Sequence, residues 1–186
     1  MQKMLSFTAM SLALMSTAAF AGGHCAAGKT LTEGTLTIAT GNPAYYPWVM
    51  ADAPESGAGF EAAVAYAVAA EMGFAADDVT WVRTSFDEAI QPGAKNFDLN
   101  IQQYSITAAR DEMVDFSMPY YTAPMAVLVG PGAVDTAATL DALKDLIWGV
   151  MVSTTALPKI ESVIQPTSDP LIYGDNADVN AAISAN

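Results

Sequence analysis

The stretch TLTIATGNP, residues 35–43, shows how the chain begins to fold. Leu36 and Ile38 alternate with small or polar residues, and this period of two predicts a β-strand with one buried face. The turn residues Gly41-Asn42-Pro43 then end the strand. The chain therefore opens with a half-buried strand followed by a loop.

A helix is predicted over residues 60–72. Val64, Ala67, Val68 and Met72 fall at the spacing i, i+3, i+4, i+8, which places them on one side of a helix. We expect this stripe to pack on the sheet. Gly73 then ends the helix.

Strands and helices continue to alternate up to Gly132. Ser85 and Glu88 have the spacing of a capping box, which predicts a short helix from residue 86. The other elements expected in this part are strands over 79–82, 98–102 and 125–129 and a helix over 107–113. This β-α-β-α-β-α-β order is typical of an open α/β sheet.

A second α/β unit is predicted after Gly132. Its expected elements are strands over 147–151 and 171–173, and helices over 139–146, from about 154, and over 176–185. A βαβ crossover needs a strand after the last of these helices, so we expect the second unit to continue beyond residue 186. The predicted organisation is a signal peptide over 1–21, a first lobe over 22–130 and a partial second lobe over 131–186.

The composition excludes several classes of function. Hydrophobic residues make up 52% of the 186 residues and charged residues 15%, so the chain can bury a core. The formal net charge of −13 argues against binding to nucleic acid or anionic lipid. One cysteine and one histidine exclude most Cys/His zinc sites and most histidine-based catalysis. We expect no metal, no cofactor and no catalytic residues.

The first 21 residues have the pattern of a secretory signal peptide. Lys3 provides the positive start, an apolar run follows, and Ala19-Phe20-Ala21 forms an A-x-A cleavage site. A membrane anchor is the weaker alternative, because the apolar run is short and interrupted by polar residues. We therefore expect an exported, periplasmic protein. Cys25 lies just after the cleavage site and is either free or paired beyond Asn186.

The stretch QQYSITAAR, residues 102–110, predicts an anion site at the start of a helix. With Thr107 as the N-cap, Arg110 falls in the first helical turn, beside free backbone N–H groups and the hydroxyls of Thr107 and Ser105. A guanidinium in this setting suits a carboxylate. The alternative is that Arg110 only pairs with a neighbouring acid such as Asp111 or Glu112.

Two aromatic positions are candidates for a ligand contact. Tyr45-Tyr46-Pro47-Trp48 follows the first strand, and Phe86 follows the second, so both can face the crevice at the carboxyl ends of the strands. For Tyr46 and Trp48 we prefer the alternative that they cover the core. Trp81 and Trp148 are expected to lie in the core.

The second unit repeats this arrangement at Ser153-Thr154-Thr155. These hydroxyl residues follow the strand predicted over 147–151 and precede a helix. The alternative is a simple helix N-cap. Two such sites facing each other would suit a ligand held between two lobes.

The sequence resembles the family 3 extracytoplasmic solute-binding proteins of polar-amino-acid ABC transporters. The order and spacing of the matching motifs hold across nearly the whole chain after the signal peptide. The matching segments are IAT (38–40), YYPW (45–48), GFE (59–61), FD (86–87), FD (97–98), SITAAR (105–110), VDFS (114–117), PYY (119–121) and GV (149–150) before STT (153–155).

The resemblance implies two α/β lobes that close on an amino acid about a hinge. In such proteins the position matching Arg110 binds the α-carboxylate, and Thr154 and Thr155 match contacts from the second lobe. The closed form would dock on a membrane permease, and we expect a monomer. The other implied binding positions are Ser105 and Thr107 beside the carboxylate, Tyr45 and Phe86 around the ligand, and Gln103 and Asn42 in the pocket.

Some residues depart from the family pattern. Gln102 and Gln103 replace small residues, which predicts a different side-chain pocket. Asn42 lies near a position that is often acidic, which weakens the case for a basic amino acid. The chain ends before the segment whose aspartate usually binds the α-amino group, so that residue is expected beyond Asn186.

Amino-acid binding and delivery without catalysis is therefore the leading hypothesis. One alternative is an enzyme similar to the cyclohexadienyl dehydratases that resemble these proteins, which would need a general acid in the cleft. Another is the sensor domain of a membrane receptor. Turnover of a prephenate-like substrate, or a transmembrane helix downstream in the gene, would identify them.

Overall fold

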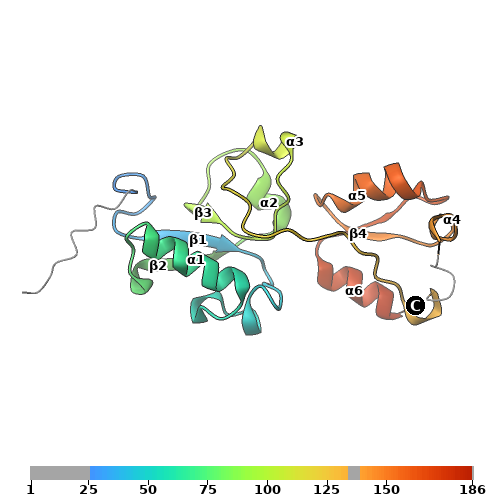
Figure 1. The fold of residues 1–186 in the computed structure, drawn as a ribbon, viewed down its shortest axis with the longest axis horizontal. Coiled ribbons are helices and arrows are strands. Elements are labelled where there is room, and N and C mark those ends of the chain that lie inside the picture. Colours follow the sequence, from blue (N-terminus) through green and yellow to red (C-terminus); the bar gives the residue numbers. More distant parts are fainter. Residues whose placement is uncertain (1–25, 134–138, 186) are drawn as a thin grey trace, which may run out of the picture.

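The computed structural model describes residues 26–133 and 139–185. The chain forms two α/β units joined by an extended connection (Figure 1). The first unit contains β1 (Leu36–Thr40), β2 (Val79–Arg83) and β3 (Leu99–Asn100), in the parallel order β2-β1-β3. The segment over 1–21 that is predicted to be a signal peptide, and Cys25, lie outside the described residues.

Helices connect the parallel strands of the first unit. The α-helices here are α1 (Phe60–Glu71), α2 (Phe86–Ile90) and α3 (Ala108–Asp111), and the 3-10 turns are η1 (Met50–Asp52), η2 (Pro54–Ser56) and η3 (Ala76–Asp78). The predicted caps are confirmed: the Ser85 hydroxyl accepts the Glu88 N–H at 3.1 Å, and Thr107 caps α3. The return half of the capping box does not form, because the Glu88 carboxylate accepts the Thr84 hydroxyl instead.

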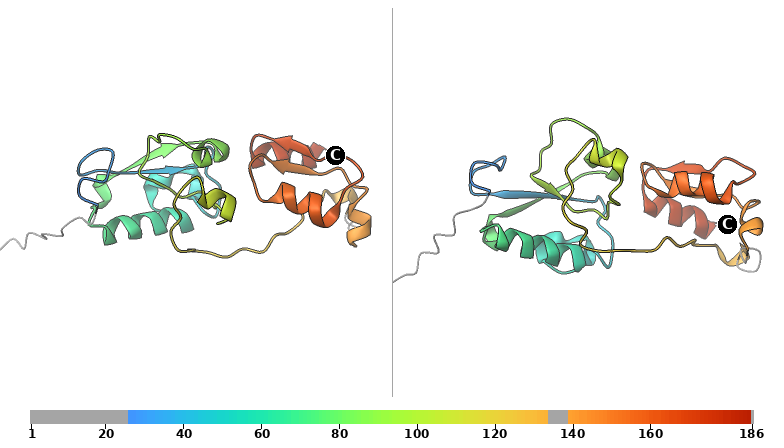
Figure 2. Two further views of the ribbon diagram at one scale, coloured as in Figure 1. Left: turned by 90° about the horizontal axis from the view of Figure 1, so that it is seen from above. Right: turned by 45° about the horizontal axis from the view of Figure 1, so that its top comes forward.

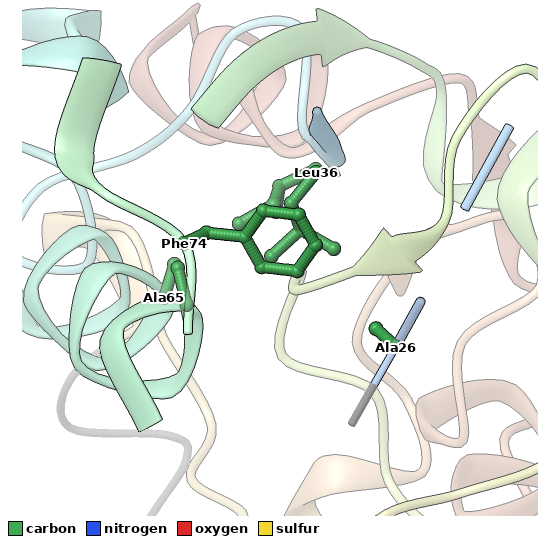
Figure 3. Packing of buried hydrophobic residues seen from close by; sticks show 6 residues of the cluster. Ala26, Leu36, Ala65 and Phe74 are labelled. Atoms are coloured by element: carbon green, nitrogen blue, oxygen red, sulfur yellow. The ribbon is translucent and has the colours of Figure 1, made fainter. Parts of the chain in front are cut away.

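The core of the first unit lies between β1 and α1. Figure 3 shows Leu36, Ala65 and Phe74 in this cluster, together with Ala26 from the start of the described chain. All five residues of β1 are buried, so the predicted half-buried strand is wrong. As the central strand, β1 has a neighbour on both edges and is covered on both faces.

The predicted stripe on α1 is wrong for Ala67 and Val68, which are exposed, whereas Met72 packs against the core as predicted. The buried face is formed by Ala62, Ala65 and Ala69 together with Glu61, whereas Val68 is exposed. Small side chains let the helix approach the sheet closely, and this close approach selects the alanine face rather than the valine face. The prediction gave weight to side-chain size and missed this possibility.

The second unit is a small parallel sheet with helices on opposite sides of it (Figure 1). Strands β4 (Gly149–Met151) and β5 (Leu171–Tyr173) pair in parallel. The helices are α4 (Leu140–Leu143), α5 (Ala156–Lys159), α6 (Asn176–Ala185) and the π-helical turn η5 (Ile160–Ile164), preceded by the 3-10 turn η4 (Pro131–Ala133). β5 and α6 have the predicted bounds, whereas β4 and α4 are shorter than predicted.

The strand predicted over 125–129 is not formed. Residues 121–130 run without strand pairing between the two units, and the two views of Figure 2 show this extended connection. Met125, Val127 and Leu128 are exposed along it. An apolar run becomes a strand only where a sheet edge accepts its backbone bonds, and this run passes between two sheets.

Candidate ligand-binding site

A cavity of about 390 Å³ lies between the two units. This volume is in the range of small-molecule sites. Its wall is formed by the segments that follow all five strands, so the carboxyl ends of both sheets face it. The lining residues are Thr40, Gly41, Asn42, Pro43, Ala44, Tyr45, Ser85, Phe86, Gln102, Gln103, Ser105, Arg110, Met151, Thr154, Thr155, Gly174, Asp175 and Asn176.

Arg110 is the cation of this cavity. Its backbone N–H donates to the Thr107 hydroxyl at 3.3 Å, as the N-cap prediction requires. Its guanidinium donates to the carbonyl of Ser105 at 2.8 Å and, across the cleft, to the carbonyl of Ser153 at 2.7 Å. A guanidinium has five N–H donors, so three have no partner among the described residues. Those donors can bind a ligand anion.

Two aromatic rings hold the Arg110 guanidinium in place. Its central carbon lies 5.5 Å from the Phe86 ring centroid and 5.2 Å from that of Tyr104. The two rings stack at 4.1 Å, and the Tyr104 hydroxyl donates to the Phe86 carbonyl. Burial lowers the pKa of Arg110, and burial also raises the pKa of Tyr104. The guanidinium remains charged, because arginine does not lose its proton in proteins.

The alternative role of Arg110 is not observed. Neither Asp111 nor Glu112 forms an ion pair with it among the described residues, where the salt bridges are Arg83–Asp52 and Lys144–Asp141. The polar partners of its side chain are backbone carbonyls, so within residues 26–133 and 139–185 its positive charge has no counter-ion. A cation held this way in a cleft favours an anionic ligand.

The second unit contributes polar groups to the opposite wall. Ser153 has a left-handed backbone with φ of 60°, and its hydroxyl donates to the Asp87 carboxylate of the first unit. The Thr154 hydroxyl donates to the Met151 carbonyl at 2.8 Å. Thr155 is the N-cap of α5 but makes no side-chain cap bond, so the simple N-cap alternative does not account for this segment.

Tyr45 also connects the two units. Its hydroxyl accepts the Ala177 N–H at 3.1 Å, at the start of α6. Burial is the main reason why the pKa of Tyr45 is raised, and the carboxylate of Asp175 raises it further. Tyr45 therefore lines the cavity from one lobe while its hydroxyl contacts the other.

Eight of the nine predicted binding residues line the cavity: Asn42, Tyr45, Phe86, Gln103, Ser105, Arg110, Thr154 and Thr155. Thr107 is not among the lining residues, because its hydroxyl caps α3. Tyr46 is 74% exposed, so the prediction that it covers the core is wrong. Trp48 does pack on other rings, at 5.8 Å from Phe60 and 5.2 Å from Tyr121.

Sequence reasoning missed the segment Gly174-Asp175-Asn176. It follows β5, so the rule that placed the other loops at the cleft would also have found it. The Asp175 carboxylate accepts the Asp178 N–H at 3.0 Å and thereby caps α6. Asp175 and Arg110 are the two charged residues that line the cavity in the described part of the chain.

The described residues hold no group of three or more histidine, cysteine or acidic side chains arranged for a metal ion. None of the helices within 26–133 and 139–185 is long and apolar enough to cross a membrane.

Two parallel α/β units with a ligand-sized cleft at the carboxyl ends of their strands define a two-lobed binding-protein fold. The family model of the bacterial extracellular solute-binding proteins, family 3, matches residues 36–169. The chain belongs to this family.

Solved structures of amino-acid-binding proteins are similar to the chain. One is an ancestral amino acid-binding protein described as a precursor of cyclohexadienyl dehydratase, with 29% identity and a TM-score of 0.65, covering 81% of this chain and 66% of that one. Another is an ancestral arginine-binding protein bound to glutamine, with 27% identity and a TM-score of 0.67, covering 82% and 65%.

A third similar structure comes from Streptococcus pneumoniae. It is an amino acid ABC transporter substrate-binding protein bound to L-arginine, with 25% identity and a TM-score of 0.65, covering 81% of this chain and 63% of that one. The chain thus spans just under two thirds of the length of these proteins. The comparison with curated proteins returned no match.

Proposed function

We propose that the chain binds an amino acid, or a related small carboxylate, and delivers it to the permease of an ABC importer. The observation that carries the proposal is Arg110, a half-buried guanidinium in the cleft with N–H donors that no described residue uses. A ligand carboxylate can take two of these donors in the bidentate geometry that arginine favours. The family and the arginine- and glutamine-bound structures support an amino acid as the ligand.

The charges of the cleft also support a zwitterion. Arg110 from the first lobe and Asp175 from the second are its charged lining residues within the described ranges. A carboxylate at Arg110 and an ammonium or cationic side chain toward Asp175 would leave the filled cleft close to neutral. A dicarboxylate would place a second negative charge near Asp175, which is unfavourable.

Closure of the lobes on the ligand is the proposed mechanism. Arg110, Asp87 and Tyr45 of the first lobe each hydrogen-bond to the second lobe. A ligand that contacts both walls would add to these bonds only when the lobes are close, and this difference in affinity shifts the population toward the closed state. The lobes themselves are proposed to span residues 22–130 and 131–186.

Export through the signal peptide at residues 1–21 is part of the same proposal. The family description is extracellular, which agrees with a periplasmic protein that meets its permease at the outer face of the membrane. We propose that the protein acts there as a monomer.

Calorimetric titration with the L-amino acids tests the proposal. Arg110→Ala should abolish detectable binding, because the ligand carboxylate would be buried without its partner at a cost of about 2–5 kcal/mol, or about 30-fold or more in Kd. Lys159→Ala is the matched control, since Lys159 is an exposed cation outside the cavity and should leave Kd unchanged. Equal affinity of wild type and Arg110→Ala would refute the proposal.

The same titrations test the role of Asp175. Asp175→Asn should weaken the binding of cationic amino acids more than that of neutral ones and should favour glutamate relative to wild type. An unchanged selectivity would remove Asp175 from the proposal while leaving Arg110 in it.

An enzyme is the second candidate, because one similar structure is described as a precursor of cyclohexadienyl dehydratase. Such an enzyme needs a proton donor in the cleft. Asp175 is the carboxyl residue that lines the cavity in the described chain. Turnover of prephenate by wild type, lost in Asp175→Asn, would replace the binding proposal with this one.

A further inference from the structure

The motif Gly59-Phe60-Glu61 buries a carboxylate that the proposed binding site does not use. Glu61 is fully buried, with 0% of its surface exposed, at the second residue of α1. A buried carboxylate is rare unless its oxygens are hydrogen-bonded. No lysine or arginine contacts it among the described residues, so its partners are neutral groups from elsewhere in the chain.

The first turn of α1 is held against the loop that contains Trp48. A Cβ at Gly59 would lie 2.5 Å from the Trp48 carbonyl oxygen, so only glycine allows this approach. The Glu61 N–H donates to the same carbonyl at 2.9 Å. The Phe60 ring packs on Trp48 and Tyr121. These contacts fix where the Glu61 side chain enters the interior.

Both oxygens of Glu61 accept hydrogen bonds from Gln103. The Gln103 backbone N–H donates to Oε1 at 2.9 Å, and its side-chain amide donates to Oε2. Gln103 lines the cavity and has a φ of 55°, in the left-handed region that residues with a Cβ rarely adopt. A residue keeps such a backbone only where its surroundings hold it there. Glu61 supplies that restraint.

A third bond ties Glu61 to the connection between the lobes. The Tyr120 hydroxyl donates to Oε1, and Tyr120 lies in the segment that leads from α3 to the second unit. One carboxylate therefore binds the wall of the cleft and the start of the inter-lobe connection together.

We infer that Glu61 is a positioning residue of the ligand-binding site. Glu61 does not itself line the cavity. It acts by holding Gln103, which does line it, in a left-handed conformation and by holding Tyr120 beside it. The role requires hydrogen-bond acceptors at this point and does not require a negative charge. It rests on the proposed binding function, because its effect is on the shape of that cleft.

A double-mutant cycle between residues 61 and 103 tests the inference. In the full chain, Glu61→Ala should raise the Kd of the tightest-binding L-amino acid by about tenfold or more. Glycine adopts positive φ without strain, so Gln103→Gly no longer needs the restraint. In the Gln103→Gly background, Glu61→Ala should therefore change Kd by less than about threefold. An equal effect in both backgrounds would overturn the inference.

Two further variants separate positioning from charge and from general damage. Glu61→Gln keeps an oxygen for the Gln103 N–H and the Tyr120 hydroxyl, and its amide can pair with a flipped Gln103 amide, so Kd should stay within about threefold of wild type. Glu71→Ala changes an exposed carboxylate of the same helix and should have no effect. If Glu61→Ala does not fold, Glu61→Asp, which shortens the carboxylate, takes its place in the cycle.

Hydrogen exchange of the Gln103 backbone N–H tests the positioning role of Glu61 without a ligand. This amide should lose protection in Glu61→Ala and keep it in Glu61→Gln. Retained protection in Glu61→Ala would overturn the inference. If wild type binds no amino acid, the function proposed for Arg110 fails, and the exchange rates still show whether Glu61 holds Gln103.

Discussion

Arg83 should contribute more to stability than an ordinary surface arginine. It lies at the end of β2, and its guanidinium donates to the Gly41 carbonyl at 2.8 Å, the Asp52 carbonyl at 2.5 Å and the Asp52 carboxylate at 2.6 Å. These bonds close the loop over residues 41–52. Arg83→Ala removes all three and leaves the buried Gly41 carbonyl unpaired. Discounted for the partial exposure of the ion pair, the loss should be about 2 kcal/mol.

Urea unfolding measures this loss. Thermal unfolding should show the same loss as a fall in Tm of about 4–8 °C in a chain of this length. The m value should not change, because the variant exposes the same surface on unfolding. Arg83→Ala should also weaken ligand binding, since residues 41–45 line the cleft.

The second described ion pair, Lys144–Asp141, provides the control. Its partners are three residues apart, and both side chains are exposed. Lys144→Ala should leave Tm unchanged, because the lysine side chain bonds only Asp141 among the described residues, and the bonds of its backbone carbonyl to Thr167 are kept in the variant. If Arg83→Ala cost less than about 0.5 kcal/mol, the reasoning that its carbonyl bonds anchor the loop would be refuted.

Two other predictions concern single side chains. Tyr45→Phe keeps the ring but removes the acceptor of the Ala177 N–H, so calorimetry should show a Kd raised about 2–10-fold. Tyr46 is an exposed neighbour, and Tyr46→Phe should leave Kd unchanged. Equal effects of the two variants would argue against the inter-lobe bond. Burial raises the pKa of Glu61 above its ordinary 4.5, so the folded protein binds the proton more tightly than the unfolded chain. The unfolding free energy relative to Glu61→Gln should therefore be highest below about pH 4.5 and fall as the pH rises through the folded pKa; a difference that rose with pH would contradict the cause given.

The elements predicted correctly from the sequence are those whose signals lie within a few residues of one another. The caps at Ser85 and Thr107 and the bounds of β5 and α6 depend on residues a few positions apart, and these predictions hold. The strand predicted over 125–129 failed because a strand also needs a partner edge. Apolar alternation in one segment carries no information on whether such an edge is near.

The site was predictable to the extent that it follows from topology. Parallel strands place the loops at their carboxyl ends around one crevice, so Arg110, Tyr45 and Thr154 could be assigned to it from the order of the elements. The same rule places Asp175 at the crevice. It was missed because residues 176–185 were considered only as a helix and not as part of the segment that follows a strand. Its position after β5 was the signal available.

Glu61 is a residue of the site that strand order could not predict. A glutamate on a helix is expected to face solvent, and the three groups that make its burial favourable come from residues 42 and 59 positions away. Nothing near Glu61 in the sequence indicates that Gln103 adopts a positive φ or that Tyr120 lies beside it. The cleft therefore has two kinds of determinant. Residues such as Arg110 contact the ligand space and can be found from strand order, whereas Glu61 determines the shape of the wall from behind and can be found only once distant segments are placed together.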